Sequence, residues 1–311
     1  MMMTELFVET PLWESPTLSD RIGRRAVLKM EAFQPAGSFK ARGMGAACLQ
    51  AKQNGVMKVV CSSGGNAGLA VAHAGQILGL EVTIVVPERT GERARNLIVR
   101  EGASLVVHGD AWDDSHEFAV RLAEETGSAY IHPFDDPEVW RGHSSIIHEV
   151  DAAGLKPGLI VVSVGGGGLL AGLLLGMDEV GWGQIPVLAL ETKGADSFAQ
   201  AMAAGELVTL PGITSIATTL GARTVCRQAL EAARKHSVTP LVVSDRQALD
   251  ACISFAEDHR VLVEPACGAA LAAGYAALGP VTEHDPVLFI VCGGAAVTPR
   301  MLTEWDQDLK N

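Results

Sequence analysis

Short apolar runs alternate with amphipathic runs along the chain. The apolar runs are rich in Val and Ile, which predicts strands at 56–61, 81–87, 104–109, 159–164, 186–191, 240–245 and 287–294. Helices are expected between them, at 67–78, 91–101, 113–126, 168–178 and 246–257. Gly79, Gly102 and Gly127 suit helix C-termini, and Asp245 suits an N-cap. This alternation predicts an α/β protein with mostly parallel sheets.

One segment, 159–177, has no charged residue and is long enough to span a bilayer. Its four consecutive glycines, Gly165–Gly168, would each cost a helix about 1 kcal/mol. The preceding LIVVSV is β-branched and suits a buried strand. We therefore expect a strand, a glycine loop and a buried helix here.

The composition narrows the function classes. The chain has 311 residues, 48% of them hydrophobic, which is enough for one or two packed domains. Its net charge of −12 argues against binding to nucleic acids or anionic membranes. Six cysteines without C-x-x-C spacing indicate reduced thiols, and the first residues lack the pattern of a secretory signal. We expect a cytoplasmic protein that acts on small molecules.

Lys40 is the first candidate for chemistry. It follows Pro35 and Gly37 at the start of an expected helix that Ser38 would cap. The helix N-terminus and the nearby Arg42 disfavour an ammonium group, so we predict a lowered pKa for Lys40. A partly neutral amine suits imine formation, although an ordinary surface lysine is the alternative.

Two glycine loops each lead from a strand into a helix. In CSSGGNAG, at 61–68, the free backbone N–H groups, two hydroxyls and a carboxamide suit a carboxylate, although a plain turn would look the same. The loop at 165–168 could hold a phosphate or pack closely. Gly166, Gly168 and Ala171 also fit a dinucleotide fingerprint, with Glu191 as the ribose contact, so an oxidoreductase stays open. Cys292 ends the strand 287–294 and is either a site residue or a core thiol.

Five motifs in this order, GSFKARG, SSGGNAG, SVGGGGLLAG, VEPACGAALAA and VCGG, resemble the pyridoxal-phosphate enzymes of fold type II. The chain is most similar to L-serine/L-threonine dehydratases of the short, mammalian-liver type. The resemblance implies two doubly wound open-sheet domains with the active site in the cleft between them. It also implies that a small domain, 40–138, is inserted into a large cofactor-binding domain made of 1–39 and 139–311.

The resemblance also assigns roles to individual residues. Lys40 would be the catalytic Schiff-base lysine, with Phe39 on the pyridine ring, Asn66 at the ring 3-oxygen and Cys292 at the ring nitrogen. The phosphate would be bound by Gly165, Gly166, Gly167, Gly168 and Leu169. The substrate carboxylate would be bound by Ser63, Gly64, Asn66 and Ala67. A monovalent cation, K+, would be bound by Glu191, Ala195, Ser197, Leu220 and Ala222.

The implied reaction is the removal of water from L-serine or L-threonine, which gives pyruvate or 2-oxobutyrate and ammonia. Lys40 would serve as the general base, and the family implies a homodimer. A thiol at Cys292 is a weak hydrogen-bond partner, which favours elimination over transamination or racemisation. A lyase accounts for all five motifs, an oxidoreductase for only one, and a catalytically silent regulator would not need Lys40. The histidines at 108, 116, 132, 143 and 148 are interpreted as structural.

Overall fold

The computed structural model describes residues 6–310, which divide into two compact units. Among these described residues, the first unit comprises 6–8 together with Gln34–His143, and the second comprises Glu9–Phe33 and 144–310. The range 40–138 expected for the small domain lies inside the first unit. Each unit is built on its own sheet.

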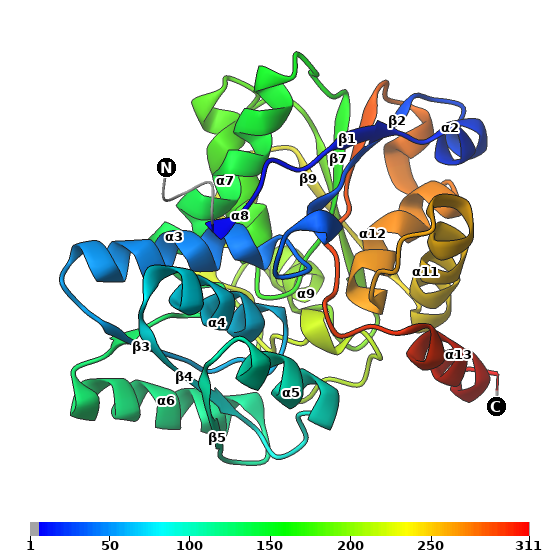
Figure 1. The fold of residues 1–311 in the computed structure, drawn as a ribbon. Helices are drawn as coiled ribbons and strands as arrows, with labels where there is room; N and C mark the ends of the chain where they lie inside the picture. The colour runs from blue at the N-terminus through cyan, green and yellow to red at the C-terminus, as the bar shows by residue number, and fades with distance from the viewer. Residues whose placement is uncertain (1–5, 311) are drawn as a thin grey trace. The chain divides into compact units, whose positions relative to one another are not determined.

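The first unit has a parallel four-stranded sheet in the order β5-β4-β3-β6. Its strands are β3 (Lys58–Cys61), β4 (Glu81–Val86), β5 (Ser104–Val107) and β6 (Ala129–Tyr130). Its helices are α3 (Lys40–Gln53), α4 (Asn66–Leu78), α5 (Glu92–Arg100) and α6 (Trp112–Thr126). Figure 1 shows α4 over one face and α6 over the other, where Ala119 and Ala123 pack on Val60 and Val85.

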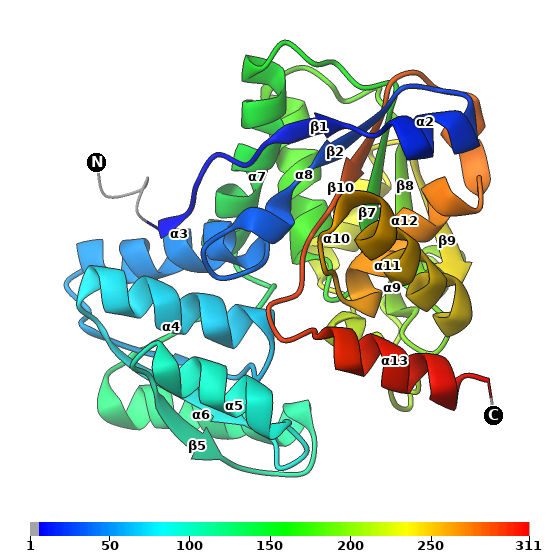
Figure 2. The ribbon, with the colours of Figure 1, turned by 45° about the vertical axis from the view of Figure 1, so that its right-hand side comes forward.

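The second unit has a six-stranded sheet in the order β1-β2-β10-β7-β8-β9, with β1 antiparallel to β2 and the other pairs parallel. Its strands are β1 (Leu12–Glu14), β2 (Ala26–Lys29), β7 (Leu159–Ser163), β8 (Val187–Thr192), β9 (Val238–Val243) and β10 (Val287–Ile290). Its helices are α2 (Pro16–Ile22), α8 (Gly168–Glu179), α9 (Ser197–Ala204), α10 (Arg227–Ala233), α11 (Asp245–His259), α12 (Pro265–Tyr275) and α13 (Pro299–Asp308). Figure 2 shows α11 and α12 on one side of this sheet and α8 on the other. The helix α7 (Pro137–Ala152) contributes residues to both units.

The α/β class and all the strands expected from the sequence are confirmed. The strands β1, β2 and β6 were not predicted, because they are short or interrupted by polar residues. The segment 159–177 is strand β7, a glycine loop and most of α8, as expected. Within residues 6–310, no helix is long and apolar enough to cross a membrane.

Two predicted helix caps are wrong. The N-cap of α11 is Ser244, whose hydroxyl accepts from the Gln247 backbone N–H at 3.2 Å, and Asp245 is the first helical residue. Ser38 does not cap α3, because Phe39 occupies the N-cap position. The buried Ser38 hydroxyl has no hydrogen-bond partner among the described residues.

Candidate functional site

Lys40 is the first residue of α3, so its amine lies at the helix N-terminus as predicted. The Lys40 Nζ donates a hydrogen bond to the Pro133 carbonyl at 2.5 Å, in the segment that follows β6. The amine also lies 5.1 Å from the centre of the Phe39 ring. The Phe39 ring contacts the imidazole of His143, with ring centres 4.9 Å apart. The Pro133 carbonyl and the Phe39 ring therefore lie next to the amine, and His143 packs behind the Phe39 ring.

Three ionisable groups near Lys40, namely His143, His132 and Cys61, are uncharged near neutral pH. Burial, followed by the charges of Lys40 and Arg42, holds the pKa of His143 well below its usual range. Burial, followed by His116 and Lys40, lowers the pKa of His132 to about 3. Burial raises the pKa of Cys61 to about 12, although Lys40 opposes this shift. Both His143 ring nitrogens are buried without a hydrogen-bond partner in the described part of the chain.

The loop between β3 and α4 brings together the residues predicted to bind the substrate carboxylate. Asn66 is the first residue of α4, and the Ser63 hydroxyl accepts from the Gly65 backbone N–H at 3.3 Å. A Cβ at position 68 would lie 1.8 Å from the Ser63 carbonyl oxygen, so only glycine allows the loop to lie this close to the helix. The first backbone N–H groups of α4 have no acceptors within the helix, which makes this opening suitable for an anion.

The Gly64 position is crowded by one flexible neighbour. A Cβ there would lie 2.6 Å from Cγ2 and 2.7 Å from Oγ1 of Thr90. The Thr90 side chain therefore occupies the space in which a methyl group at position 64 would stand.

The glycine loop after β7 also opens directly into a helix. Gly167 is the N-cap of α8 and has a φ of +89°. A Cβ at Gly165 would lie 2.9 Å from the Leu220 Cα, and a Cβ at Gly167 would lie 2.6 Å from the Ala229 Cβ. The loop therefore packs closely against its neighbours. Its geometry also suits the binding of an anion, since the first N–H groups of α8 have no acceptors within the helix. Leu169 is buried in the first turn of α8.

Glu191 does not serve as a ribose contact. Its carboxylate accepts from the backbone N–H groups of Phe198 at 2.9 Å and Ala199 at 2.7 Å, so it holds the N-terminus of α9. Glu191 is fully buried, and burial raises its pKa to about 8. This arrangement counts against the dinucleotide interpretation.

The residues predicted to bind a monovalent cation fall into two groups. Glu191, Ala195 and Ser197 lie together where β8 passes into α9, and the buried Ser197 hydroxyl has no hydrogen-bond partner among the described residues. The Ser197 residue directly precedes Phe198, whose N–H group binds the Glu191 carboxylate, and a buried oxygen without a partner suits an oxygen-ligated cation. Leu220 ends the η2 turn (Thr218–Leu220) and Ala222 comes shortly after it, and the Leu220 backbone packs against Gly165.

Cys292 follows β10 and is 5% exposed. A hydrogen bond with the Cys267 thiol of α12, together with burial, raises the pKa of Cys292 well above its usual range. Cys292 therefore presents a neutral thiol. All six cysteines are buried and free, as the sequence indicated.

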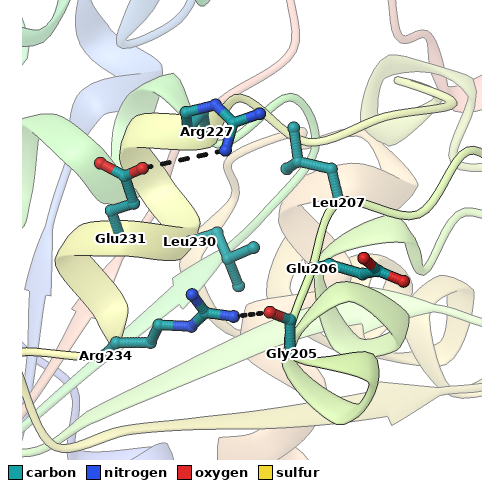
Figure 3. A pocket seen from close by; sticks show the side chains of 7 residues that line it. All are labelled: Gly205, Glu206, Leu207, Arg227, Leu230, Glu231 and Arg234. Atoms are coloured by element: carbon teal, nitrogen blue, oxygen red, sulfur yellow. Dashed lines mark hydrogen bonds and ion pairs between the residues drawn. The ribbon is translucent and has the colours of Figure 1, made fainter.

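A charged surface pocket lies elsewhere in the second unit, between the end of α9 and α10 (Figure 3). It is lined by Gly205, Glu206, Leu207, Arg227, Leu230, Glu231 and Arg234. Arg227 pairs with Glu231 at 3.9 Å, and Arg234 donates to the Gly205 carbonyl. None of the predicted site residues lines this pocket. Across residues 6–310, no group of three His, Cys, Asp or Glu side chains is placed to hold a metal ion.

A family model for pyridoxal-phosphate-dependent enzymes matches residues 3–293, and the chain belongs to this family. The chain is 46% identical to a rat protein named "Serine dehydratase-like", over 95% of this chain and 92% of that protein. It is 45% identical to the human "L-serine dehydratase/L-threonine deaminase", over 98% and 96%. The crystal structure of an L-serine ammonia-lyase from the fungus Rhizomucor miehei is similar at a TM-score of 0.92, with 38% identity over 97% of this chain and 98% of that one.

The resemblance to pyridoxal-phosphate enzymes of fold type II is thus confirmed, and so is the cofactor class. The residues present fit this cofactor, since the chain offers an intact lysine and a glycine cradle at a helix N-terminus. The sequence did not reveal the surroundings of Lys40, namely Pro133, His132 and His143. The one available indication was the irregular stretch HPFDDPE after the short β6.

Proposed function

We propose that the chain is a pyridoxal-phosphate-dependent lyase that removes water from L-serine and L-threonine, giving pyruvate or 2-oxobutyrate and ammonia. The observation that carries the proposal is the Lys40 amine at the start of α3, held by the Pro133 carbonyl near the neutral imidazoles of His132 and His143. The human relative named for both substrates, 45% identical over 98% of this chain, supports the same activity.

Each part of the cofactor has proposed partners in the chain. Lys40 would bind the aldehyde carbon, Phe39 would pack on the ring, Asn66 would donate to the ring oxygen and Cys292 would face the ring nitrogen. The phosphate would be held by Gly165, Gly166, Gly167, Gly168 and Leu169. When bound, pyridoxal phosphate supplies an electron sink that stabilises negative charge at the substrate α-carbon.

The side chains and backbone of this chain would do the remaining work. Backbone N–H groups at the start of α4, with Ser63, Gly64, Asn66 and Ala67, would bind the substrate carboxylate and orient the α-carbon. The neutral Lys40 amine would take the α-proton as general base and keep it at Nζ. Because the Cys292 thiol is neutral and a weak hydrogen-bond partner, it would not hold a proton on the ring nitrogen as a carboxylate would. This difference favours elimination over transamination or racemisation.

The proposal includes K+ bound by Glu191, Ala195, Ser197, Leu220 and Ala222, a homodimer, and a cytoplasmic location. The orphaned Ser197 hydroxyl supports the cation, and the six free thiols are typical of a reducing compartment. Light scattering of the purified protein tests the dimer, and titration with KCl while product formation is followed tests the cation.

The deciding experiment records the visible absorption of the purified protein before and after L-serine is added, with Lys40→Ala alongside. We expect an absorption band of the lysine-bound cofactor that changes on addition of L-serine and recovers as pyruvate accumulates. The Lys40→Ala variant should lack this band and form no pyruvate. A band that responds to neither L-serine nor L-threonine would contradict the proposed substrates, and no band after addition of pyridoxal phosphate would contradict the role of Lys40.

A further inference from the structure

Five aromatic and imidazole rings form a cluster in the first unit, where β6 ends and α6 begins. We call Trp112, His116, Tyr130, His132 and Phe134 the ring cluster. His132 makes edge contacts with the other four members, with ring centres 4.6 Å apart for Phe134 and 5.4 Å for His116. Its distances to Tyr130 and Trp112 are 6.0 Å and 6.1 Å. His132 is thus fixed in orientation by rings on several sides.

The Nδ1 atom of His132 accepts two backbone hydrogen bonds. The donors are the N–H groups of Phe134, at 3.2 Å, and Asp135, at 2.8 Å. An imidazole can accept at Nδ1 only when that nitrogen carries no proton, so the ring is neutral with its hydrogen on Nε2. The pKa of about 3, caused by burial and then by His116 and Lys40, agrees with this state.

These two hydrogen bonds close a turn around Pro133. The proline ring fixes its own φ, and the Trp140 indole donates to the Phe134 carbonyl at 2.8 Å, which anchors the far side of the turn. The only backbone hydrogen-bonding group of Pro133 is its carbonyl, which accepts from the Lys40 Nζ at 2.5 Å. The position of this carbonyl therefore depends on the two hydrogen bonds that the His132 Nδ1 atom accepts.

We propose that His132 is a positioning residue for Lys40, because it holds the turn whose Pro133 carbonyl binds and orients the lysine amine. This inference rests on the proposed function, in which Lys40 is the reacting lysine. An amine that donates one hydrogen to a fixed carbonyl is held at a defined place whenever it is not bonded to the cofactor. General-base catalysis requires this geometry.

Other residue types would not fulfil this role. A protonated imidazole would lose the acceptor at Nδ1 and would repel the lysine ammonium. His143 also lies close to Lys40, but its ring nitrogens accept from no group in the described chain, so it cannot fix a turn. His132 has an acceptor at Nδ1, is neutral, and is fixed by the rings packed around it.

Two substitutions separate the acceptor from the ring. His132→Phe keeps an aromatic ring in the ring cluster and removes the acceptor. His132→Asn removes the ring but places an amide oxygen where Nδ1 stood, so that it can accept the same two N–H groups. His108→Phe is the matched control, because His108 stacks on Phe118 in the same unit, with ring centres 4.2 Å apart, and has no part in the turn.

The first measurement is the pH dependence with which acetic anhydride labels Lys40 in the full chain freed of cofactor, followed by peptide mass spectrometry. The Pro133 carbonyl stabilises the ammonium form, so its displacement in His132→Phe should move the midpoint of labelling down by about one pH unit, a tenfold change in protonation equilibrium. His132→Asn and His108→Phe should label as the unmodified chain does. Trp140→Phe, which loses the indole anchor, should shift in the same direction by less.

The second measurement is kcat and KM for L-serine in the holoenzyme. His132→Phe should lower kcat about tenfold and leave KM within about twofold, because it disturbs the base and not the carboxylate site. His132→Asn should recover most of kcat. If His132→Asn labels and turns over like His132→Phe, or if His132→Phe labels like the unmodified chain, the inference is overturned.

The two measurements also separate this inference from the proposed function. If the labelling shifts are found but the holoenzyme forms neither pyruvate nor 2-oxobutyrate, the positioning of Lys40 stands and the proposed reaction is wrong. If pyruvate forms but labelling does not move, the reaction stands and the role of His132 is wrong. Should His132→Phe fail to fold, a shifted midpoint in His132→Asn would still overturn the inference.

Discussion

The openings of α4 and α8 are built on the same plan and differ in chemistry. In each, a buried parallel strand passes through a glycine loop into a helix, as in β3 to Asn66 and β7 to Gly168. The α4 opening presents hydroxyls, a carboxamide and backbone N–H groups, whereas the α8 opening presents backbone alone. The same local fold can thus serve a carboxylate with side chains or a phosphate with backbone N–H groups.

The two openings also differ in how much space they leave for an added side chain. Around the α8 loop, Gly165 packs against the Leu220 backbone. Gly167 has a φ of +89°, and a Cβ added there would lie 2.6–3.1 Å from its nearest neighbours. In the α4 loop, Gly64 is crowded only by the Thr90 side chain within its three nearest contacts. A side chain can rotate away from an added methyl group and a backbone cannot, so we expect the α8 opening to be rigid and the α4 opening to be adjustable.

A third helix opening, at α9, is already filled by a carboxyl group of the protein. The Glu191 carboxylate accepts the backbone N–H groups of Phe198 and Ala199. This opening shows how the fold satisfies a helix N-terminus where no anionic ligand is expected to bind.

The largest effect is expected from Gly167→Ala in the rigid opening. Left-handed backbone and the contact with Ala229 should together lower the free energy of unfolding by about 3 kcal/mol and weaken retention of pyridoxal phosphate. Gly181→Ala is the matched control, because its φ is +75° but a Cβ there would meet nothing within 4 Å. Chemical denaturation and cofactor titration of both variants would check this, and equal losses would show that only the backbone angle matters.

A smaller effect is expected from Asn66→Ala, which removes the carboxamide that distinguishes the α4 opening. Activity with L-serine should fall about tenfold to a hundredfold, since a polar contact to the reacting groups is lost, while the fold is retained. Steady-state kinetics would measure this change. Unchanged kinetics would mean that backbone N–H groups alone serve this opening too.

Glu191, at the start of α9, makes the free energy of unfolding of the chain depend on pH. Its pKa is raised from 4.5 to about 8 in the folded chain, so the unfolded chain loses this proton first. The resulting stabilisation is complete below about pH 4.5 and is lost as the pH rises to about 8. Glu191→Gln should remove this decline, and K+ should stabilise the unmodified chain most above pH 8. Thermal melts from pH 5 to pH 9, with KCl or tetramethylammonium chloride, would measure both; parallel pH curves for the two proteins would contradict this expectation.

The smallest effect is expected from Gly64→Ala in the adjustable opening. Because the Thr90 side chain must turn away, KM for L-serine should change by about threefold or less. In the double variant Gly64→Ala/Thr90→Ala, most of that change in KM should disappear. Comparing the two single variants with the double variant therefore tests whether the two side chains interact. A large loss that Thr90→Ala does not relieve would show that this loop is as rigid as the other.

Much of this architecture could be predicted from the sequence, because buried parallel strands and glycine loops leave strong local patterns. The β2 strand left a weaker pattern, since Lys29 ends it. That lysine is 1% exposed, and its amine donates to the Thr10 carbonyl at 2.7 Å and the Glu149 carboxylate at 2.5 Å. A charge buried by partners 19 and 120 residues away cannot be recognised locally.

The site shows the same division. Lys40 and the two glycine loops are marked by their own neighbours in the chain, whereas the turn at His132 reaches Lys40 from 93 residues away. The N-cap of α11 is also marked locally. Ser244 and Gln247 have the S-x-x-Q spacing of a capping box and form one, so the sequence favours Ser244 over Asp245 as the N-cap.

The six buried cysteine thiols can report when their surroundings in the protein open to solvent. Thiol reagents attack thiolates, and burial raises the pKa of Cys48, Cys61, Cys252 and Cys292, so these groups react only when their surroundings open. Cys48 and Cys61 belong to the first unit, and Cys226, Cys252, Cys267 and Cys292 belong to the second. Mass spectrometry after treatment with a thiol reagent would show the order in which these six positions are labelled. That order would indicate which of the two units opens first, without any engineered probe.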